Sequence, residues 1–374
     1  MTEVPDGDAT ATLAERVRRV RERMVELDID VLAVSVGPDL PWLTGYEAMP
    51  LERLTMLVLP ADGAATLVVP GLEVPRVVER PALFELRGWE EVEDPVGIVA
   101  RLVGTAPTVA VGDRTWSRFL LALQRQLPGR RWVPASAVTG PLRAVKDPAE
   151  VGALRRAASA ADRVAEALVA GAIGIAGRTE AEVGRALADA LVAEGHERVN
   201  FTIVASGPHG ASPHHDPGAR RIGPGDVVVC DFGGTLDGYC SDVTRTVTVG
   251  DPGPEPVAVH EVVARARDAA VAAVRAGVAA AGVDGAARAV ITAAGYGPAF
   301  VHRTGHGIGR EEHEDPYLVA GNAEVLVAGN AFSIEPGIYL PGRFGVRIED
   351  IVVVTEAGPE VLNQASRHLA VLDA

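Results

Sequence analysis

The 374-residue sequence contains little cysteine. Only two cysteines are present, Cys230 and Cys240, and this number excludes a disulfide framework. Side chains alternate across a strand, so Cys230 faces away from Asp231, whereas Cys240 lies on the same face as Asp242. A bridge between the two is therefore not expected. Both are interpreted as small buried thiols in a reducing compartment.

Long apolar runs and an excess of positive charge are also missing. No uninterrupted stretch of about 18 apolar residues occurs, so no membrane span is expected. The first residues, MTEVPDGDATATLAERVRRVRERM, are charged and helical rather than apolar, which argues against a secretory signal and for a cytoplasmic location. The net charge of −15 argues against a nucleic-acid partner, because phosphate binding needs a basic surface.

The length favours two domains. Residues 12–140 begin with the helical pattern LAERVRRVRERMVELD and then alternate strand-like runs (DVLAVSV, LTMLVLP, AATLVVP and PTVAVG) with helical ones such as SRFLLALQRQL. This alternation predicts an α/β domain. A second domain over 141–374 is indicated by Asp147-Pro148-Ala149-Glu150, which has the residues of a helix N-cap and its capping box.

The second domain repeats its order of elements. Two helices over 147–195, the second beginning at Thr179, precede strands at 200–205 and 227–249. Two further helices, at 256–280 and 284–294, precede strands near 300, 332 and 346. We expect a pseudo-symmetric α+β fold with sheet inside, helices outside and a site between its halves.

The stretch VVVCDFGGTLDGYCSDVTRTVTVG (227–250) places two aspartates inside a predicted hairpin. A turn centred on Leu236-Asp237 would put Asp231 directly opposite Asp242, whereas a turn on Asp237-Gly238 would make them diagonal neighbours. In both registers the carboxylates lie close together and repel unless a cation or a proton intervenes.

Three other segments of this domain carry charged or metal-binding side chains on apolar, strand-like sequence. FVHRTGHGIGREEHEDP holds three histidines, FSIEPGIYL holds Glu335, and GVRIEDIVVVT holds Glu349. Each has an ordinary explanation by itself: a surface histidine, the end of a strand, or pairing of Glu349 with Arg347. Together with the two aspartates, four acids and a histidine suit divalent first-row metals.

These segments, with SPHHDPGARRIGPGD before them, resemble in order and spacing the metal-dependent aminopeptidases with the pita-bread fold, metallopeptidase family M24. The resemblance is closest to the Xaa-Pro dipeptidases (prolidases) and Xaa-Pro aminopeptidases. It extends more weakly to the first domain, where PWLTGY and the helix-first pattern are similar to the creatinase/prolidase N-terminal domain. The implied architecture is that domain over 12–140 followed by a pita-bread catalytic domain over 141–374.

The resemblance implies a role for each matching residue. Five would be ligands of two metals: Asp231, Asp242, His306, Glu335 and Glu349. Asp242 and Glu349 would bridge the metals, and Glu335 would also carry protons. His214 and His313 would be catalytic, while His302, Tyr339 and Arg347 would bind substrate or support the site. His214 is chosen over His215 on spacing, and His209, in the same loop, is left open.

The implied activity is hydrolysis of the bond between an N-terminal residue and a following proline. Two divalent ions per chain, Mn²⁺ or Co²⁺ with Zn²⁺ or Fe²⁺ as alternatives, would activate a water molecule. The substrates would be proline-containing dipeptides or short peptides, and a homodimer is implied. The alternatives are a pita-bread hydrolase or lyase acting on a small non-peptide molecule, and a non-catalytic binding protein.

Overall fold

The computed structural model describes residues 6–374 and divides into two compact units, Met1–Arg143 and Ala144–Ala374. The sequence placed this division between residues 140 and 141. Among the described residues, no helix is both long and apolar enough to cross a membrane.

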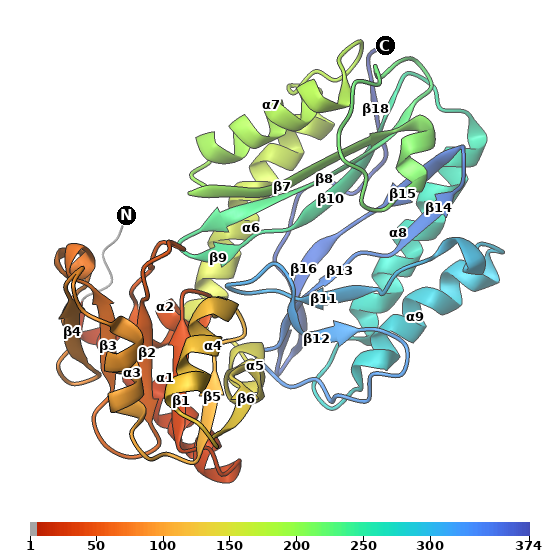
Figure 1. Cartoon of the computed structure of the whole chain (residues 1–374). Coiled ribbons are helices and arrows are strands. Elements are labelled where there is room, and N and C mark those ends of the chain that lie inside the picture. The colour runs from red at the N-terminus through yellow and green to blue at the C-terminus, as the bar shows by residue number, and fades with distance from the viewer. Residues whose placement is uncertain (1–5) are drawn as a thin grey trace. The chain divides into compact units, whose positions relative to one another are not determined.

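The first unit is a six-stranded mixed sheet with helices on both faces (Figure 1). Its strand order is β4-β3-β2-β1-β5-β6. The strands are β1 (Val31–Ser35), β2 (Met56–Pro60), β3 (Thr66–Pro70), β4 (Glu85–Trp89), β5 (Thr108–Val111) and β6 (Arg131–Pro134). The helices are α1 (Asp6–Glu26), α2 (Asp39–Thr44), the 3₁₀ helix η1 (Gly71–Arg76), α3 (Pro95–Val103), α4 (Ser117–Gln126) and α5 (Ser136–Ala144).

Alternation along the strands builds two apolar cores in this unit. Leu32 and Val34 of β1 face a core shared with α1, α2 and α5, whereas Val31 and Ala33 face one shared with α3 and α4. The sequence anticipated β1, β2, β3 and β5. It did not anticipate β4, whose sequence ELRGW carries two charged residues and a glycine among its five residues.

The second unit holds two five-stranded sheets and a separate two-stranded hairpin. Its helices are α6 (Pro148–Val169), α7 (Glu180–Ala193), η2 (Gly207–Ala211), α8 (Pro254–Ala273), α9 (Ala280–Ala293) and η3 (Gly297–Ala299). The first sheet has the order β18-β10-β8-β7, with β9 paired to β8; its strands are β7 (Arg198–Ser206), β8 (Val227–Leu236), β9 (Tyr239–Cys240), β10 (Val243–Val249) and β18 (Ala370–Leu372). The second has the order β12-β11-β13-β16-β17; its strands are β11 (Gly305–Gly307), β12 (Glu314–Leu318), β13 (Ala331–Ile334), β16 (Asp350–Thr355) and β17 (Gly358–Val361). The hairpin pairs β14 (Gly337–Leu340) with β15 (Phe344–Arg347).

Each half of this unit packs two helices against one sheet, as the repeat predicts. Helices α6 and α7 share a core with β7, β8 and β10, and α8 and α9 share another with β13 and β16 (Figure 1). A matching short bridge joins the start of the second helix of each half to a later loop, Thr179 to Arg221 and Ala279 to Val325. The pseudo-symmetric α+β fold expected from the sequence is therefore present.

Local sequence signals locate two of these four helix starts closely. Asp147 with Glu150, and Thr179 with Glu182, form complete capping boxes at α6 and α7. The prediction that the last helix begins at Asp284 is wrong, because α9 begins at Ala280. Asp284 instead accepts hydrogen bonds from the backbone N–H and hydroxyl of Thr304.

The hairpin that carries the two aspartates adopts the diagonal register. Asp237 and Gly238 have φ values of 51° and 73°, so the turn is centred on them, as a two-residue hairpin loop requires. Asp231 consequently pairs with Thr244, and direct opposition of Asp231 and Asp242 does not occur.

The segment GVRIEDIVVVT is not a single strand. It forms β15, which ends at Arg347, and β16, which begins at Asp350 and belongs to a different sheet. Glu349 lies at the break between the two, where the chain leaves the hairpin and enters the second sheet.

Candidate metal centre and active site

One cavity of about 540 Å³ in the second unit brings most of the predicted site residues together. Its lining includes Asp231, Asp242, His306, Glu335 and Glu349, together with His214, His302, His313 and Arg347. Asp231 points into it because its strand neighbours Cys230 and Phe232 point the other way, into the core beneath the helices. Of the predicted site residues, only Tyr339 is not among the lining residues.

The carboxylates in this cavity are buried and crowd one another. Ligand atoms of Asp242, His306 and Glu349 all lie within 4.8 Å of one another. Burial, and then repulsion from Glu349 and Asp231, raises the pKa of Asp242 well above its ordinary value. Burial and the charge of Glu335 do the same to the pKa of Glu349, and burial raises the pKa of Glu335 to about 7.

His306 presents a lone pair to these acids. Its Nδ1 lies 3.2 Å from the carbonyl oxygen of Gly307, and a carbonyl can only accept, so Nδ1 carries the proton. The other nitrogen, Nε2, then faces Glu335 Oε1 at 3.4 Å and Asp242 Oδ2 at 3.7 Å. Burial lowers the pKa of His306 to about 3, which keeps the ring neutral. A neutral imidazole whose second nitrogen is held by a carbonyl is typical of a metal ligand.

Arg347 contacts a different acid from the one expected. The sequence paired it with Glu349, but its Nη2 donates to Asp231 Oδ2 at 2.6 Å, and no hydrogen bond to Glu349 is found among the described residues. The break between β15 and β16 removes the shared strand face on which that expectation relied. The other oxygen of Asp231, Oδ1, is buried and has no hydrogen-bond partner in the described part of the chain.

Tyr339 supports the site from behind the cavity wall. Its hydroxyl accepts from Arg347 Nη1 at 2.8 Å and lies 2.8 Å from His302 Nε2. His302 Nδ1 donates to the carbonyl of Arg303, so Nε2 is the acceptor and Tyr339 donates to it. Both ring nitrogens of His302 are therefore occupied, and the ring can offer only its carbon edge or a face to the cavity.

The other two predicted catalytic histidines, His214 and His313, are exposed and open to a ligand. Neither ring makes a hydrogen bond within residues 6–374, and His313 packs edge-on against His306 with ring centroids 4.1 Å apart. The neighbouring His215 points elsewhere, to Glu180, with a distance of 2.9 Å between its Nε2 and Glu180 Oε2. Of the two adjacent histidines, the structure thus brings His214 to the cavity.

Two functional candidates were missed by the sequence reasoning. Thr244 accepts from Arg347 Nε at 3.1 Å and donates to Glu349 Oε2 at 2.6 Å, so it links both sides of the cluster. Its position two residues after Asp242, on the same face of the strand predicted from the sequence, was a usable signal. Arg303 lines the cavity and carries the second guanidinium there. Nothing in the local sequence distinguishes it from a surface arginine.

Comparison of this chain with known proteins identifies its family. The model of metallopeptidase family M24 matches residues 152–356, and that of the creatinase/prolidase N-terminal domain matches 16–145. The chain belongs to metallopeptidase family M24. It is therefore an enzyme, a metal-dependent peptidase, with the pita-bread fold in its second unit.

Solved structures of this family cover nearly the whole chain. The dipeptidase PepE of Mycobacterium ulcerans is 48% identical, with a TM-score of 0.90, and the match covers 98% of this chain and 99% of that one. A prolidase from Thermococcus sibiricus is 36% identical, with a TM-score of 0.89 and coverage of 96% and 99%. An Xaa-Pro dipeptidase from Bacillus anthracis is 30% identical, with a TM-score of 0.89 and coverage of 96% and 100%.

The cavity suits the divalent metals on which the M24 family depends. The five predicted ligands on its wall supply four carboxylates and the neutral imidazole of His306, an oxygen-rich set appropriate to first-row divalent ions. The unpartnered Oδ1 of Asp231 and the mutual repulsion of the other acids are both relieved by cations at this place. The residues of the cavity therefore suit the divalent metal ions on which the family depends.

Proposed function

We propose that the protein is an Xaa-Pro dipeptidase that uses two divalent metal ions. The observation that carries the proposal is the convergence of five potential ligands with His214, His302 and His313 on one cavity. These residues come from segments up to 135 positions apart in the chain, and only the fold brings them together. The M24 structures named for dipeptidase and prolidase activity support the same conclusion.

The metal ions would be held by Asp231, Asp242, His306, Glu335 and Glu349. Two dications supply four positive charges, which offset the four carboxylates of the set. When bound, such a pair lowers the pKa of a water molecule and polarises a substrate carbonyl. From the resemblance, Mn²⁺ and Co²⁺ are the ions we would test first.

The remaining chemistry belongs to side chains of the cavity. Glu335 lines the cavity, and its carboxylate would accept a proton from the attacking water and deliver it to the departing nitrogen. His313 has unoccupied ring nitrogens with which to hydrogen-bond the scissile carbonyl oxygen. His214 is equally free to bind the amine or amide of the substrate, and Arg347 fixes the position of Asp231.

Selection of proline would come from His302. With both nitrogens engaged, its ring forms a wall without free hydrogen-bonding groups, next to Phe300, whose ring centroid lies 5.3 Å away. A pyrrolidine ring packs against such a wall and forms a tertiary amide that has no N–H to satisfy. A polar side chain at the same position would lose hydrogen bonds to water.

Arg303 favours a dipeptide over a longer peptide. Arg347, the other cation of the cavity, is committed to Asp231, Thr244 and Tyr339. The Arg303 guanidinium makes no hydrogen bond within the described residues, and it lies over the ring of Tyr317 at 4.4 Å. It lines the same cavity as His302, so we expect it to pair with a carboxylate that ends the chain just beyond the proline ring.

The proposal is tested with a small set of substrates. The metal-loaded enzyme should hydrolyse Ala-Pro far faster than Ala-Ala, and faster than Ala-Pro amide or Ala-Pro-Ala. Arg303→Ala should reduce hydrolysis of Ala-Pro but not of the amide, and Arg303→Lys should restore part of the difference. Equal rates on Ala-Pro and Ala-Ala would remove the proline assignment. Release of no proline at all would favour the small non-peptide substrate.

Assembly and location stay predictions. The resemblance implies a homodimer and the composition suggests the cytoplasm, so we propose both for this chain. Sedimentation of the purified protein checks the first, and fractionation of the producing cells checks the second.

A further inference from the structure

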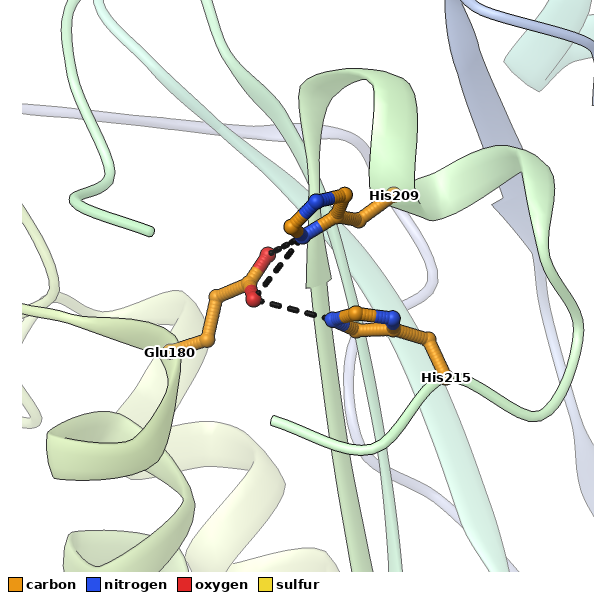
Figure 2. Close-up of side chains that lie close together, drawn as sticks. All are labelled: Glu180, His209 and His215. Carbon is orange, nitrogen blue, oxygen red and sulfur yellow. Dashed lines mark hydrogen bonds and ion pairs between the residues drawn. The ribbon is translucent and has the colours of Figure 1, made fainter. Parts of the chain in front are cut away.

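A second cluster of histidine and carboxylate lies outside the ligand set. Glu180, the first residue of α7, has a fully buried side chain against which two imidazoles are directed (Figure 2). His209 Nδ1 lies 3.0 Å from each of its oxygens, and His215 Nε2 lies 2.9 Å from Oε2. The two rings lie side by side, with centroids 4.3 Å apart.

The composition of this cluster matches a two-histidine, one-carboxylate metal site, but its contacts favour a different role. Besides the two imidazoles, Glu180 accepts from the backbone N–H and the hydroxyl of Ser206 and from the backbone N–H of Gly218. Five donors thus surround one carboxylate, so its lone pairs are used without a metal. The cluster has the composition of a metal site but the hydrogen bonding of a buried, fully satisfied anion.

These donors all belong to one stretch of chain. Ser206 ends β7 and Gly218 ends the segment that follows, so Glu180 holds both ends of residues 207–218, which we call the His214 segment. His209 and His215 hold it at two points in between. From the cavity side, Arg347 Nη1 donates to the carbonyl of Pro213 at 3.3 Å. His214 therefore lies between one anchor on Pro213 and another on His215.

The middle of the segment is also seated closely on the hairpin. A Cβ at Gly210 would lie 2.9 Å from the backbone nitrogen of Gly345, so only glycine allows this approach. With this contact and the Glu180 anchors in place, few positions remain for His214. Its free ring is directed to the cavity by the backbone rather than by hydrogen bonds of its own.

We propose that Glu180 is a positioning residue that acts through the His214 segment and fixes His214 for substrate binding. This inference rests on the proposed function, in which His214 binds the amine or scissile amide. Removing one charge from the centre of five donors frees the segment. The proposed metal ligands stay in place, because within residues 6–374 none of their side chains hydrogen-bonds to these donors.

The test combines Glu180→Gln with His214→Ala. In the wild-type background, E180Q should lower kcat/KM for the best dipeptide roughly ten- to a hundredfold, because small misplacements of a binding group are costly. In the H214A background, the same change should cost less than about twofold, because a residue that acts through His214 has no effect to exert once that imidazole is gone; independent sites would instead show equal losses in both backgrounds. Glu182→Ala is the matched control, since it weakens the capping box of the same helix without contacting the segment. It should show no dependence on His214.

Hydrogen–deuterium exchange provides a readout that does not require peptide hydrolysis. E180Q should speed exchange over 207–218, and E182A should not. Equal losses of kcat/KM by E180Q in both backgrounds, or unchanged exchange in the segment, would overturn the inference. If the enzyme releases no proline, only the proposed function fails, because the exchange experiment still reports on the anchor.

Measuring the number of bound metal ions distinguishes two interpretations of the Glu180 cluster, a hydrogen-bonded anchor and a metal site. Wild type and E180Q, loaded with Mn²⁺ or Zn²⁺, should bind the same number of ions per chain. Loss of one ion in E180Q would show that the cluster is a third metal site, and the positioning role would be withdrawn.

Discussion

Two clusters in the second unit use the same residue types in opposite ways. In the cavity of the candidate metal centre, which we call the metal-centre cavity, the proposed ligand set consists of four carboxylates and the imidazole of His306. The Glu180 cluster instead gathers two imidazoles, two backbone N–H groups and a hydroxyl around one carboxylate. In the first, burial and neighbouring acids raise the pKa of Asp242 and Glu349. In the second, burial is outweighed by hydrogen bonds from Ser206, His215 and His209, which lower the pKa of Glu180 to about 2.

The distances between imidazole nitrogens and carboxylate oxygens also differ between the two clusters. His306 Nε2 lies 3.4 and 3.7 Å from the carboxylate oxygens that face it, too far for a good hydrogen bond but suited to two ligands of one ion. The imidazole nitrogens around Glu180 lie at 2.9 to 3.0 Å, which is hydrogen-bond distance. The balance of acceptors and donors, more than the list of residues, decides which cluster needs cations.

Chelation of metal ions should have the largest effect. It should act on the metal-centre cavity and leave the hydrogen bonds of the Glu180 cluster unchanged. Removal of divalent ions from the wild-type enzyme should abolish peptide hydrolysis and lower the melting temperature, because the four carboxylates then repel one another. Addition of Mn²⁺ or Co²⁺ should restore both. Activity and melting temperature are measured before and after verified metal removal. Unchanged melting and activity in metal-free protein would contradict the assignment of the cavity.

The second-largest effect should be a loss of folding stability at acidic pH that depends on Glu180. The folded pKa of about 2 lies below the ordinary value of 4.5, so ionised Glu180 stabilises the fold above pH 4.5, and that stabilisation is lost as the pH falls toward 2. We expect metal-free E180Q to be about 2 kcal/mol less stable than metal-free wild type at pH 7. Urea unfolding from pH 7 to pH 3 should show this gap narrowing below pH 4.5. A gap that stays constant with pH would mean that the charge of Glu180 is not what holds the segment.

The sequence predicted the members of the metal-centre cavity better than it predicted their partners. Four acids on apolar strand-like segments are unusual enough to be noticed without a structure, and local rules located the capping boxes of α6 and α7. Arg347 was paired with the wrong acid because its partner, Asp231, is 116 positions away and is reached only through the fold.

The Glu180 cluster was missed for a related reason. Glu180 stands in TEAE, where the capping pattern accounts for Thr179 and Glu182 and leaves Glu180 looking like an ordinary first-turn acid. Asp284 was taken as the first residue of a helix, although it lies inside α9 and its carboxylate accepts a hydrogen bond from Thr304. Polar side chains near helix starts have both local and distant partners available, and local patterns reveal only the first.

Thr244 gives a smaller test within the metal centre. Thr244→Val keeps the shape but removes the hydrogen bond to Glu349 and the acceptor for Arg347. Groups that orient metal ligands in this way typically contribute 10- to 100-fold to affinity or activity, so we expect a loss of roughly that size in Mn²⁺ binding or kcat/KM. Thr248→Val is the control, because that hydroxyl lies on the same strand but bonds only backbone carbonyls. Equal effects of the two variants would reduce Thr244 to a structural residue.

The smallest expected effect is the change in the free energy of unfolding when either of two aspartates in the metal-centre cavity is replaced by asparagine. The sign of this change should differ between the two positions. Asp242 is buried among other acids and accepts no hydrogen bond from residues 6–374, so Asp242→Asn should stabilise the metal-free protein by about 1 kcal/mol while abolishing activity of the metal-treated protein. Asp231 is paired with the buried Arg347, so Asp231→Asn should destabilise the metal-free protein by leaving that guanidinium without its counter-charge. Urea unfolding of both variants in chelator measures the difference. If both substitutions destabilise to the same extent, repulsion among the carboxylates is not the force that makes this cavity require cations.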